Sequence, residues 1–151
     1  ESVDQIAAAV DRYRARWIIE EFFKALKTGT AYQKRQFESR RAMLNALAVL
    51  GPVAWRLLAL RATSRDSSET PATRVLTEVQ VKILKAIVKK RKLNIKLSRV
   101  PTVREAMLAI AALGGHIKYN GPTGWQTLGA GMDYLLVAEL GWWLHADLGK
   151  K

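Results

Sequence analysis

Five segments of the sequence are predicted to be α-helices, and this helical pattern constrains the fold more than any other feature. The segments run from Ser2 or Asp4 to about residue 27, and over about residues 40–62, 77–90, 103–113 and 125–146. Apolar residues three and four positions apart share a helix face, whereas a half-buried strand requires alternation at every second residue. No convincing alternation of that kind is present, although residues 93–97 or 116–119 would fit short extended pieces. The sequence therefore predicts a mainly α protein.

Capping and helix-breaking residues set the predicted helix ends. Thr28-Gly29-Thr30 ends the first helix, and Thr77 with Gln80 forms a capping box that opens the third. Gly51-Pro52 lies inside the second helix, where we expect a kink or a break because proline lacks the backbone donor. A Ser/Thr-rich stretch with a proline, residues 63–73, is typical of an exposed linker. We therefore divide the chain into residues 1–64, a linker at 65–74 and a second helical part at 75–151.

The composition indicates a polyanionic partner. The 151 residues carry a net charge of +12, a surplus typical of proteins that bind nucleic acid or an acidic membrane surface. A membrane-surface protein requires a basic amphipathic helix, and the basic tract at residues 82–96 is too interrupted to supply one. No apolar run approaches the ~20 residues of a membrane span. Cysteine is absent, which excludes disulfides and thiolate metal sites. We therefore expect DNA, and no membrane, as the partner.

Tyr13, Arg16, Glu20 and Lys27 form the most informative local pattern, Y-x2-R-x3-E-x6-K, and are called the quartet below. On a regular helix the four side chains fall within a wedge of roughly 60° and span about 21 Å of axis. A carboxylate between two phosphate-binding cations suits a group that holds a divalent metal against a phosphodiester. The simpler interpretation is a solvated helix face, on which Arg16 and Glu20 form an ion pair worth ~0.2–0.5 kcal/mol. Glu21 points ~100° away from Glu20 and is expected to make a structural contact.

Two segments of the chain resemble a known protein family. Residues 13–29, YRARWIIEEFFKALKTG, resemble the YREK signature of bacterial cut-and-paste transposases, the DDE enzymes of the group that includes the transposon-five transposase. Residues 109–116, AIAALGGH, followed by residues 121–128, GPTGWQTL, resemble the C-terminal region of the same proteins. The resemblance spans about residues 13–140. It departs from the family at Gly129 and Met132, where members often carry tryptophans.

The resemblance implies the helical end of an RNase H-like catalytic core, followed by a small helical C-terminal dimerisation domain. In that family two aspartates on strands and one glutamate on a late helix bind two divalent metal ions, usually Mg²⁺, with Mn²⁺ as the alternative. The metals serve hydrolysis and strand transfer at transposon ends. Glu20 resembles the third catalytic carboxylate and metal ligand. Tyr13, Arg16 and Lys27 resemble the residues that bind the transposon-end DNA backbone.

The function implied is that of one part of a DNA transposase. The two strand-borne aspartates would lie upstream of Glu1, and the first residues carry no initiator Met. We therefore expect a piece of a longer protein that is catalytically inert by itself and binds no metal alone. Its partners would be transposon-end DNA and a second copy of the chain, in the bacterial cytoplasm beside the nucleoid.

The alternative is a non-catalytic helical module that binds DNA backbone or pairs with protein, and that would inhibit an intact transposase. The basic tract at residues 82–96 either contacts DNA phosphates or is a solvated helix end. The apolar stripe of the last helix either faces the domain's own core or a partner. Glycines there would allow another helix to approach closely, and one of Trp142 and Trp143 is a candidate interface anchor. Trp17 and Trp55 are predicted to be core residues. These glycines are Gly129, Gly131 and Gly141.

Overall fold

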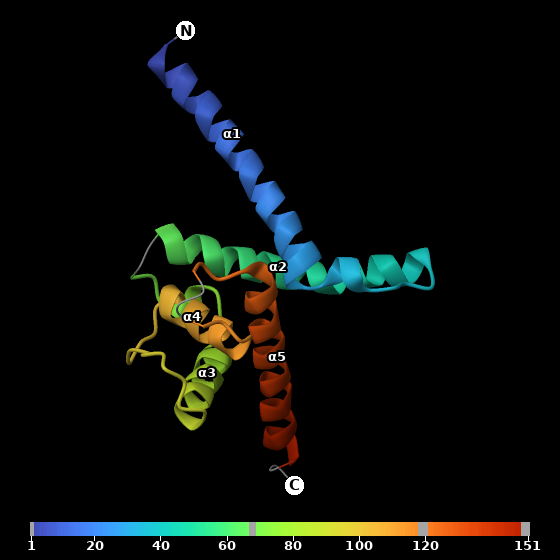
Figure 1. Ribbon diagram of the computed structural model, residues 1–151, viewed down its shortest axis with the longest axis vertical. Helices are drawn as coiled ribbons and strands as arrows, with labels where there is room; N and C mark the ends of the chain where they lie inside the picture. Colours follow the sequence, from blue (N-terminus) through green and yellow to red (C-terminus); the bar gives the residue numbers. More distant parts are fainter. Residues whose placement is uncertain (1, 67–68, 118–120, 149–151) are drawn as a thin grey trace.

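A computed structural model describes residues 2–66, 69–117 and 121–148 of the chain, and helices dominate it (Figure 1). The described residues contain no strand, only one isolated antiparallel bridge between Pro71 and Thr102. The prediction of a mainly α protein is confirmed. The elements are α1 (Val3–Lys24), the π-turn η1 (Ala25–Gly29), the 3₁₀ turn η2 (Tyr32–Lys34), α2 (Arg40–Asp66), the 3₁₀ turn η3 (Ala72–Arg74), α3 (Glu78–Lys90), α4 (Val103–Leu113) and α5 (Trp125–Leu148).

Capping boxes start three of these helices, including the one predicted at Thr77 and Gln80. The Gln80 backbone N–H donates to Thr77 Oγ1 at 3.1 Å, and the Thr77 N–H donates to Gln80 Oε1 at 3.1 Å. Ser2 with Gln5 opens α1 in the same way, and Thr102 with Glu105 opens α4. Each box satisfies backbone donors that have no partner inside the helix, so these short sequence signals fix the helix starts.

The second helix continues through Gly51-Pro52, so the break that was one of the two expected outcomes does not occur. Pro52 is exposed, and so is Ala48, whose carbonyl loses its helical donor at the proline. An exposed carbonyl can accept from water instead, which lowers the cost of the missing bond. The helix also runs to Asp66, four residues beyond the predicted end at residue 62.

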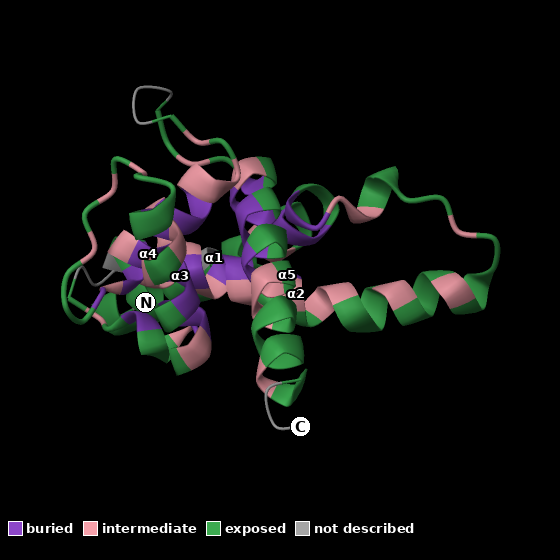
Figure 2. Ribbon diagram, turned by 90° about the horizontal axis from the view of Figure 1, so that it is seen from below, coloured by how far each residue is buried: buried purple, intermediate pink, exposed green. Residues whose placement is uncertain are grey.

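The hydrophobic core lies where α2, α4 and α5 pack together, with α3 against α4 and α5 and with η1 against α2 and α5 (Figure 2). Its members come from both sides of the predicted linker at residues 65–74. Residues 63–73 were expected to form an exposed linker. That expectation is wrong at Ser64 and Ala72, which are buried. The Ala72 N–H donates to the Pro101 carbonyl at 2.7 Å, so this stretch is held against the start of α4. The large apolar side chains that are fully buried in the hydrophobic core include Leu57, Leu60, Leu84, Ile110, Leu128, Met132 and Leu135.

Two glycines of α5, Gly129 and Gly131, allow this helix to pack closely against other elements of the chain. A Cβ atom built on Gly129 would overlap the carbonyl oxygen of Gly29 in η1. A Cβ atom built on Gly131 would overlap the carbonyl oxygen of Ile110 in α4. Close helix approach at Gly129 and Gly131 is therefore confirmed, and the elements that approach belong to the same chain. Gly141 has no atom within 4 Å of such a Cβ.

Three helical stretches project from the core: α1, the N-terminal half of α2 and the C-terminal half of α5 (Figure 1). Large apolar side chains are exposed along all three. Trp17 and Trp55 are 53% and 60% exposed, so their assignment to the core is wrong. The predicted stripe of α5 is divided, because Met132 and Leu135 lie in the core whereas Leu140 is exposed. Helical spacing reveals that a face is apolar but does not reveal what covers it.

Among the described helices, α2 alone is long and apolar enough to cross a membrane, judged by length and composition. Its segment Arg40–Arg65 contains an 18-residue window with a mean hydropathy of 1.6, of which 22% is buried in the structure. No segment of this kind was expected from the sequence, because no uninterrupted apolar run approaches ~20 residues. The C-terminal half of α2 contributes Leu57 and Leu60 to the core, as a helix of a globular domain also does.

Candidate functional site

The quartet lies at the C-terminal end of α1 and in η1. Tyr13, Arg16 and Glu20 are exposed on α1, and Lys27 is exposed on the π-turn that follows. The regular 100° spacing that places Lys27 beside Glu20 ends at Lys24, because the π-turn closes with wider i→i+5 hydrogen bonds. The structure thus brings Arg16 and Glu20 together directly and places Lys27 on the adjoining turn.

The π-turn is fixed by packing at the centre of the molecule. Ala25, Leu26 and Gly29 are buried, while Lys27 between them faces outward. The Thr30 hydroxyl donates to the Leu26 carbonyl at 2.6 Å and helps to close the turn. Because η1 contacts both α2 and α5, the outward direction of Lys27 is set by the core rather than by α1 alone.

Arg16 and Glu20 form the ion pair that the simpler interpretation predicts. Arg16 Nε lies 4.0 Å from Glu20 Oε1, and the two side chains are 72% and 49% exposed. Such an exposed pair is weak, since water screens both charges and long side chains lose rotamer freedom on pairing. The carboxylate of Glu20 therefore remains accessible to a stronger cation.

Glu21 makes the structural contact expected of it. Its Oε1 accepts from Lys24 Nζ at 2.9 Å, and its Oε2 lies 3.9 Å from Arg61 Nη1 on α2. The Arg61 guanidinium also stacks 4.4 Å from the centre of the Trp125 ring, at the start of α5. Glu21 thus links α1 to the core, and Glu20 is directed elsewhere.

The residues around Glu20 do not by themselves form a site for two divalent metal ions. In the described part of the chain, no three His, Cys, Asp or Glu side chains gather as a metal site requires. Asp11, the nearest aspartate on α1, is nine residues away, or about 13 Å along the axis. Glu21 is directed to Lys24 and Arg61. Two cations require several carboxylates, so Glu20 can contribute only one ligand to a larger set.

No model of a known protein family matches this chain. The resemblance to DDE transposases therefore rests on the two sequence segments quoted above.

The basic tract at residues 82–96, which begins on α3 and continues into the connection after it, has a mixed role in the structure. Lys85 Nζ donates to the Arg99 carbonyl at 2.8 Å, and the Arg91 guanidinium lies 4.5 Å from the centre of the Tyr134 ring on α5. These two cations therefore hold α3 against its neighbours. Lys89, Lys90 and Lys92 are exposed at the C-terminal end of α3, where the helix dipole favours positive charge.

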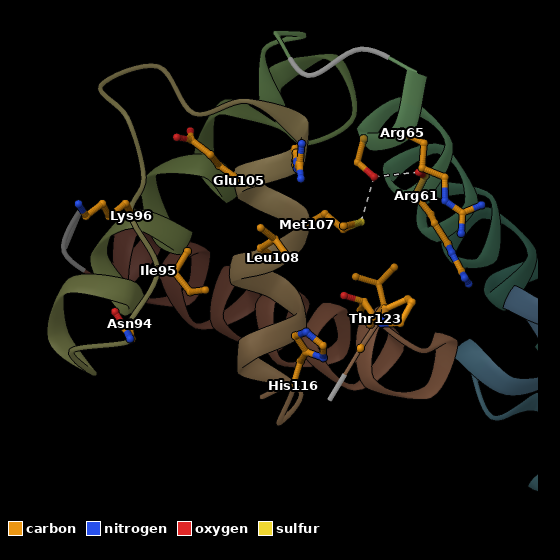
Figure 3. Close-up of a pocket in the computed structure, with 15 residues that line it drawn as sticks. Arg61, Arg65, Asn94, Ile95, Lys96, Glu105, Met107, Leu108, His116 and Thr123 are labelled. Carbon is orange, nitrogen blue, oxygen red and sulfur yellow. Dashed lines mark hydrogen bonds between the residues drawn. The ribbon is translucent and has the colours of Figure 1, made fainter. Parts of the chain in front are cut away.

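A second concave site was missed by the sequence analysis. A pocket of about 820 Å³ opens between the C-terminal end of α2, helix α4 and the connections at residues 94–96 and 121–123 (Figure 3). Its lining residues come from segments that are far apart in the sequence, so no local spacing indicates it. The sequence does contain the cations that line it on α2 and α4, Arg61, Arg65 and Arg104, but not their proximity.

Proposed function

We propose that this chain is part of a DDE transposase, in which Glu20 supplies one metal-binding carboxylate. Tyr13, Arg16 and Lys27 contact the phosphate backbone of the transposon end, and residues of the C-terminal part pair two copies. The observation that carries the proposal is the quartet itself. All four side chains are exposed, three along the middle and C-terminal part of a projecting helix and Lys27 on the turn after it, and the neighbouring Glu21 is engaged in a structural contact.

The surroundings of the quartet support this proposal. Arg12, Lys34, Arg40 and Arg41 are exposed and add positive charge to the projecting elements. Apolar side chains of α1, such as Ile18, Ile19 and Phe23, are about half exposed on the same helix. A solvated helix does not retain such side chains without a partner, and the remainder of an RNase H-like core would cover them. The full catalytic centre would then form where that core meets Glu20.

DNA binding by the quartet is testable on the chain itself. The double substitution Arg16→Ala and Lys27→Ala is expected to weaken binding to duplex DNA and to reduce the slope of log K against log salt by about 2, one per lost phosphate contact. Fluorescence anisotropy over a range of salt concentrations measures both quantities. Arg74→Ala with Arg99→Ala removes the same charge from exposed positions away from α1 and is expected to retain the wild-type slope. Equal slopes for both double variants would contradict the proposal.

A non-catalytic module that pairs protein chains is the second candidate, and the C-terminal half of α5 favours it. Trp142 and Trp143 are adjacent, 49% and 51% exposed, and surrounded by the exposed Leu140 and Leu144. Tryptophan is enriched among the residues that dominate binding at protein interfaces. This surface would serve self-pairing in either candidate function.

Self-association should therefore depend on these two tryptophans. Trp142→Ala with Trp143→Ala is expected to raise the dimer dissociation constant by a factor of about 30 or more, since one such anchor contributes about 2 kcal/mol. Sedimentation velocity over a concentration series measures it. Trp55→Ala removes an equally exposed tryptophan on α2 and serves as the control. If the double variant dimerised like the wild type, α5 would not be the pairing surface.

A further inference from the structure

The pocket beside α4 has the size of a small-molecule site. Its volume of about 820 Å³ lies within the range of roughly 300–1,000 Å³ that is usual for ligand pockets. Figure 3 shows Arg61 and Arg65 on one side of it, and Ile95 and Asn94 across α4 on the other. The pocket is separate from the quartet, since no quartet residue lines it.

The charged lining of the pocket is dominated by cations: Arg61, Arg65, Lys96 and Arg104. Within the described ranges, Arg65, Lys96 and Arg104 form no ion pair with a carboxylate. Burial lowers the pKa of Arg61, and the nearby charge of Arg65 lowers it further, while Glu21 partly offsets both effects. An anion placed between these arginines would relieve their repulsion.

Glu105 is the one carboxylate among the lining residues, and it does not neutralise these cations. Its Oε2 accepts from the Ser98 hydroxyl at 2.7 Å and from the Thr102 N–H at 3.0 Å. Burial raises the pKa of Glu105, but the hydrogen bonds from Ser98 and Thr102 outweigh it, so the pKa is lowered overall. Figure 3 shows its carboxylate directed away from Arg61. The pocket therefore keeps its excess of positive charge.

Apolar side chains form another part of the wall, beside the polar Asn94, His116 and Thr123. Met107 and Leu108 project from α4, Ile95 comes from the connection after α3, and Leu128 comes from α5. The Ser64 hydroxyl beside them is already engaged with the Arg61 carbonyl and with Met107 Sδ. A ligand that fills the pocket must therefore combine an anionic group with an uncharged apolar body. A small inorganic anion would leave the apolar wall uncovered.

We propose that this pocket binds a nucleotide, with its phosphate at Arg65 and Arg104 and its base against Met107 and Leu108. Arginine suits the phosphate, because its planar guanidinium donates two parallel hydrogen bonds to an oxyanion. The choice of a nucleotide among anions with an apolar body rests on the proposed function, in which DNA is the partner. The nucleotide comes either from the free pool or from an unpaired end of a DNA strand.

The test is a titration of the purified chain with deoxyadenosine monophosphate in an isothermal titration calorimeter, which measures the dissociation constant. The wild type is expected to bind it at least about tenfold more tightly than inorganic phosphate, because only the nucleotide covers the apolar wall. Arg65→Ala with Arg104→Ala is expected to weaken nucleotide binding by about tenfold or more. Arg40→Ala with Arg41→Ala removes the same charge at the far end of α2, and is expected to leave the affinity within about twofold.

Several results would overturn this assignment. They are the absence of nucleotide binding, equal affinity for inorganic phosphate, or wild-type affinity in the Arg65/Arg104 double variant. Arg65→Lys with Arg104→Lys keeps the charge but loses the paired donors, so it separates loss of recognition from loss of folding. A single-stranded oligonucleotide that displaces the mononucleotide identifies a DNA strand as the source, and one that fails to displace it identifies the free nucleotide.

The outcome is distinguishable from that of the proposed function. The pocket variants leave α1 intact, and binding of duplex DNA is measured separately with the Arg16/Lys27 double variant. If the wild-type chain binds no nucleotide, while the Arg16/Lys27 double variant shows the expected lower duplex salt slope, the pocket alone is rejected. The reverse result rejects the role of the quartet in DNA binding and leaves the pocket in place.

Discussion

Gly129→Ala is expected to lower the free energy of unfolding by about 3 kcal/mol or more, the upper range for an overpacked core. The added Cβ would overlap the backbone of Gly29, which cannot rotate away as a side chain can. Relief therefore requires α5 to separate from η1, and Gly29 lies only two residues from Lys27. For a chain of this length the melting temperature should fall by roughly 6–12 °C, as circular dichroism would show.

Gly141→Ala is the matched control for that experiment. It lies on the same helix, and no atom lies within 4 Å of the Cβ position. Alanine is the better helix former by about 0.5–1 kcal/mol, so this variant should be slightly more stable than the wild type. If Gly129→Ala melted at or above the temperature of Gly141→Ala, α5 would not pack against η1 as the structure shows.

Glu20→Gln is expected to reduce strand cleavage and transfer by a factor on the order of 10³ or more, in the longer protein that the proposed function implies. Glutamine preserves the size of the side chain but lacks the negative charge that a hard divalent cation requires of its ligand. A gel assay of strand joining with Mg²⁺ and a transposon-end duplex measures the effect.

Glu21→Gln is the informative comparison, because the two carboxylates are adjacent in the sequence and differ in their contacts. Glu21 pairs with Lys24 and lies near Arg61, so its loss should reduce stability while the chemistry continues. The proposal for Glu20 would be abandoned if Glu20→Gln still joined strands at the wild-type rate, or if the two variants lost activity equally.

The helix starts were predictable from the sequence because their causes are local. Thr77 with Gln80 acts within a single turn, and the predicted fourth helix agrees with Val103–Leu113. The structural role of Glu21 followed from its angular offset of ~100° from Glu20 on the same helix. Such features depend on residues within about four positions of one another, which is the range that sequence patterns describe.

The remaining features depend on contacts between distant segments. The exposure of Trp17 and Trp55 reflects the position of other helices, which the periodicity of α1 and α2 does not specify. The π-turn at η1 forms where Gly29 meets Gly129, one hundred residues later in the chain. The cationic pocket likewise combines α2, α4 and two connections. Sequence spacing therefore predicted the quartet as a face, but not the turn on which its last member lies.

Helix α1 is attached to the core at only one end, which affects the three quartet residues that it carries, Tyr13, Arg16 and Glu20, unequally. A rotation of about 10° around the junction with η1 would displace the far end of α1 by roughly 6 Å, given ~1.5 Å of rise per residue. The same rotation would move the backbone of Glu20 by about 1 Å, and that of Tyr13 by about 3 Å. Thermal bending of this helix would thus vary the position of Tyr13 relative to a bound phosphate. The Glu20 carboxylate, which lies close to the junction with η1, would keep a nearly constant distance from the body of the protein.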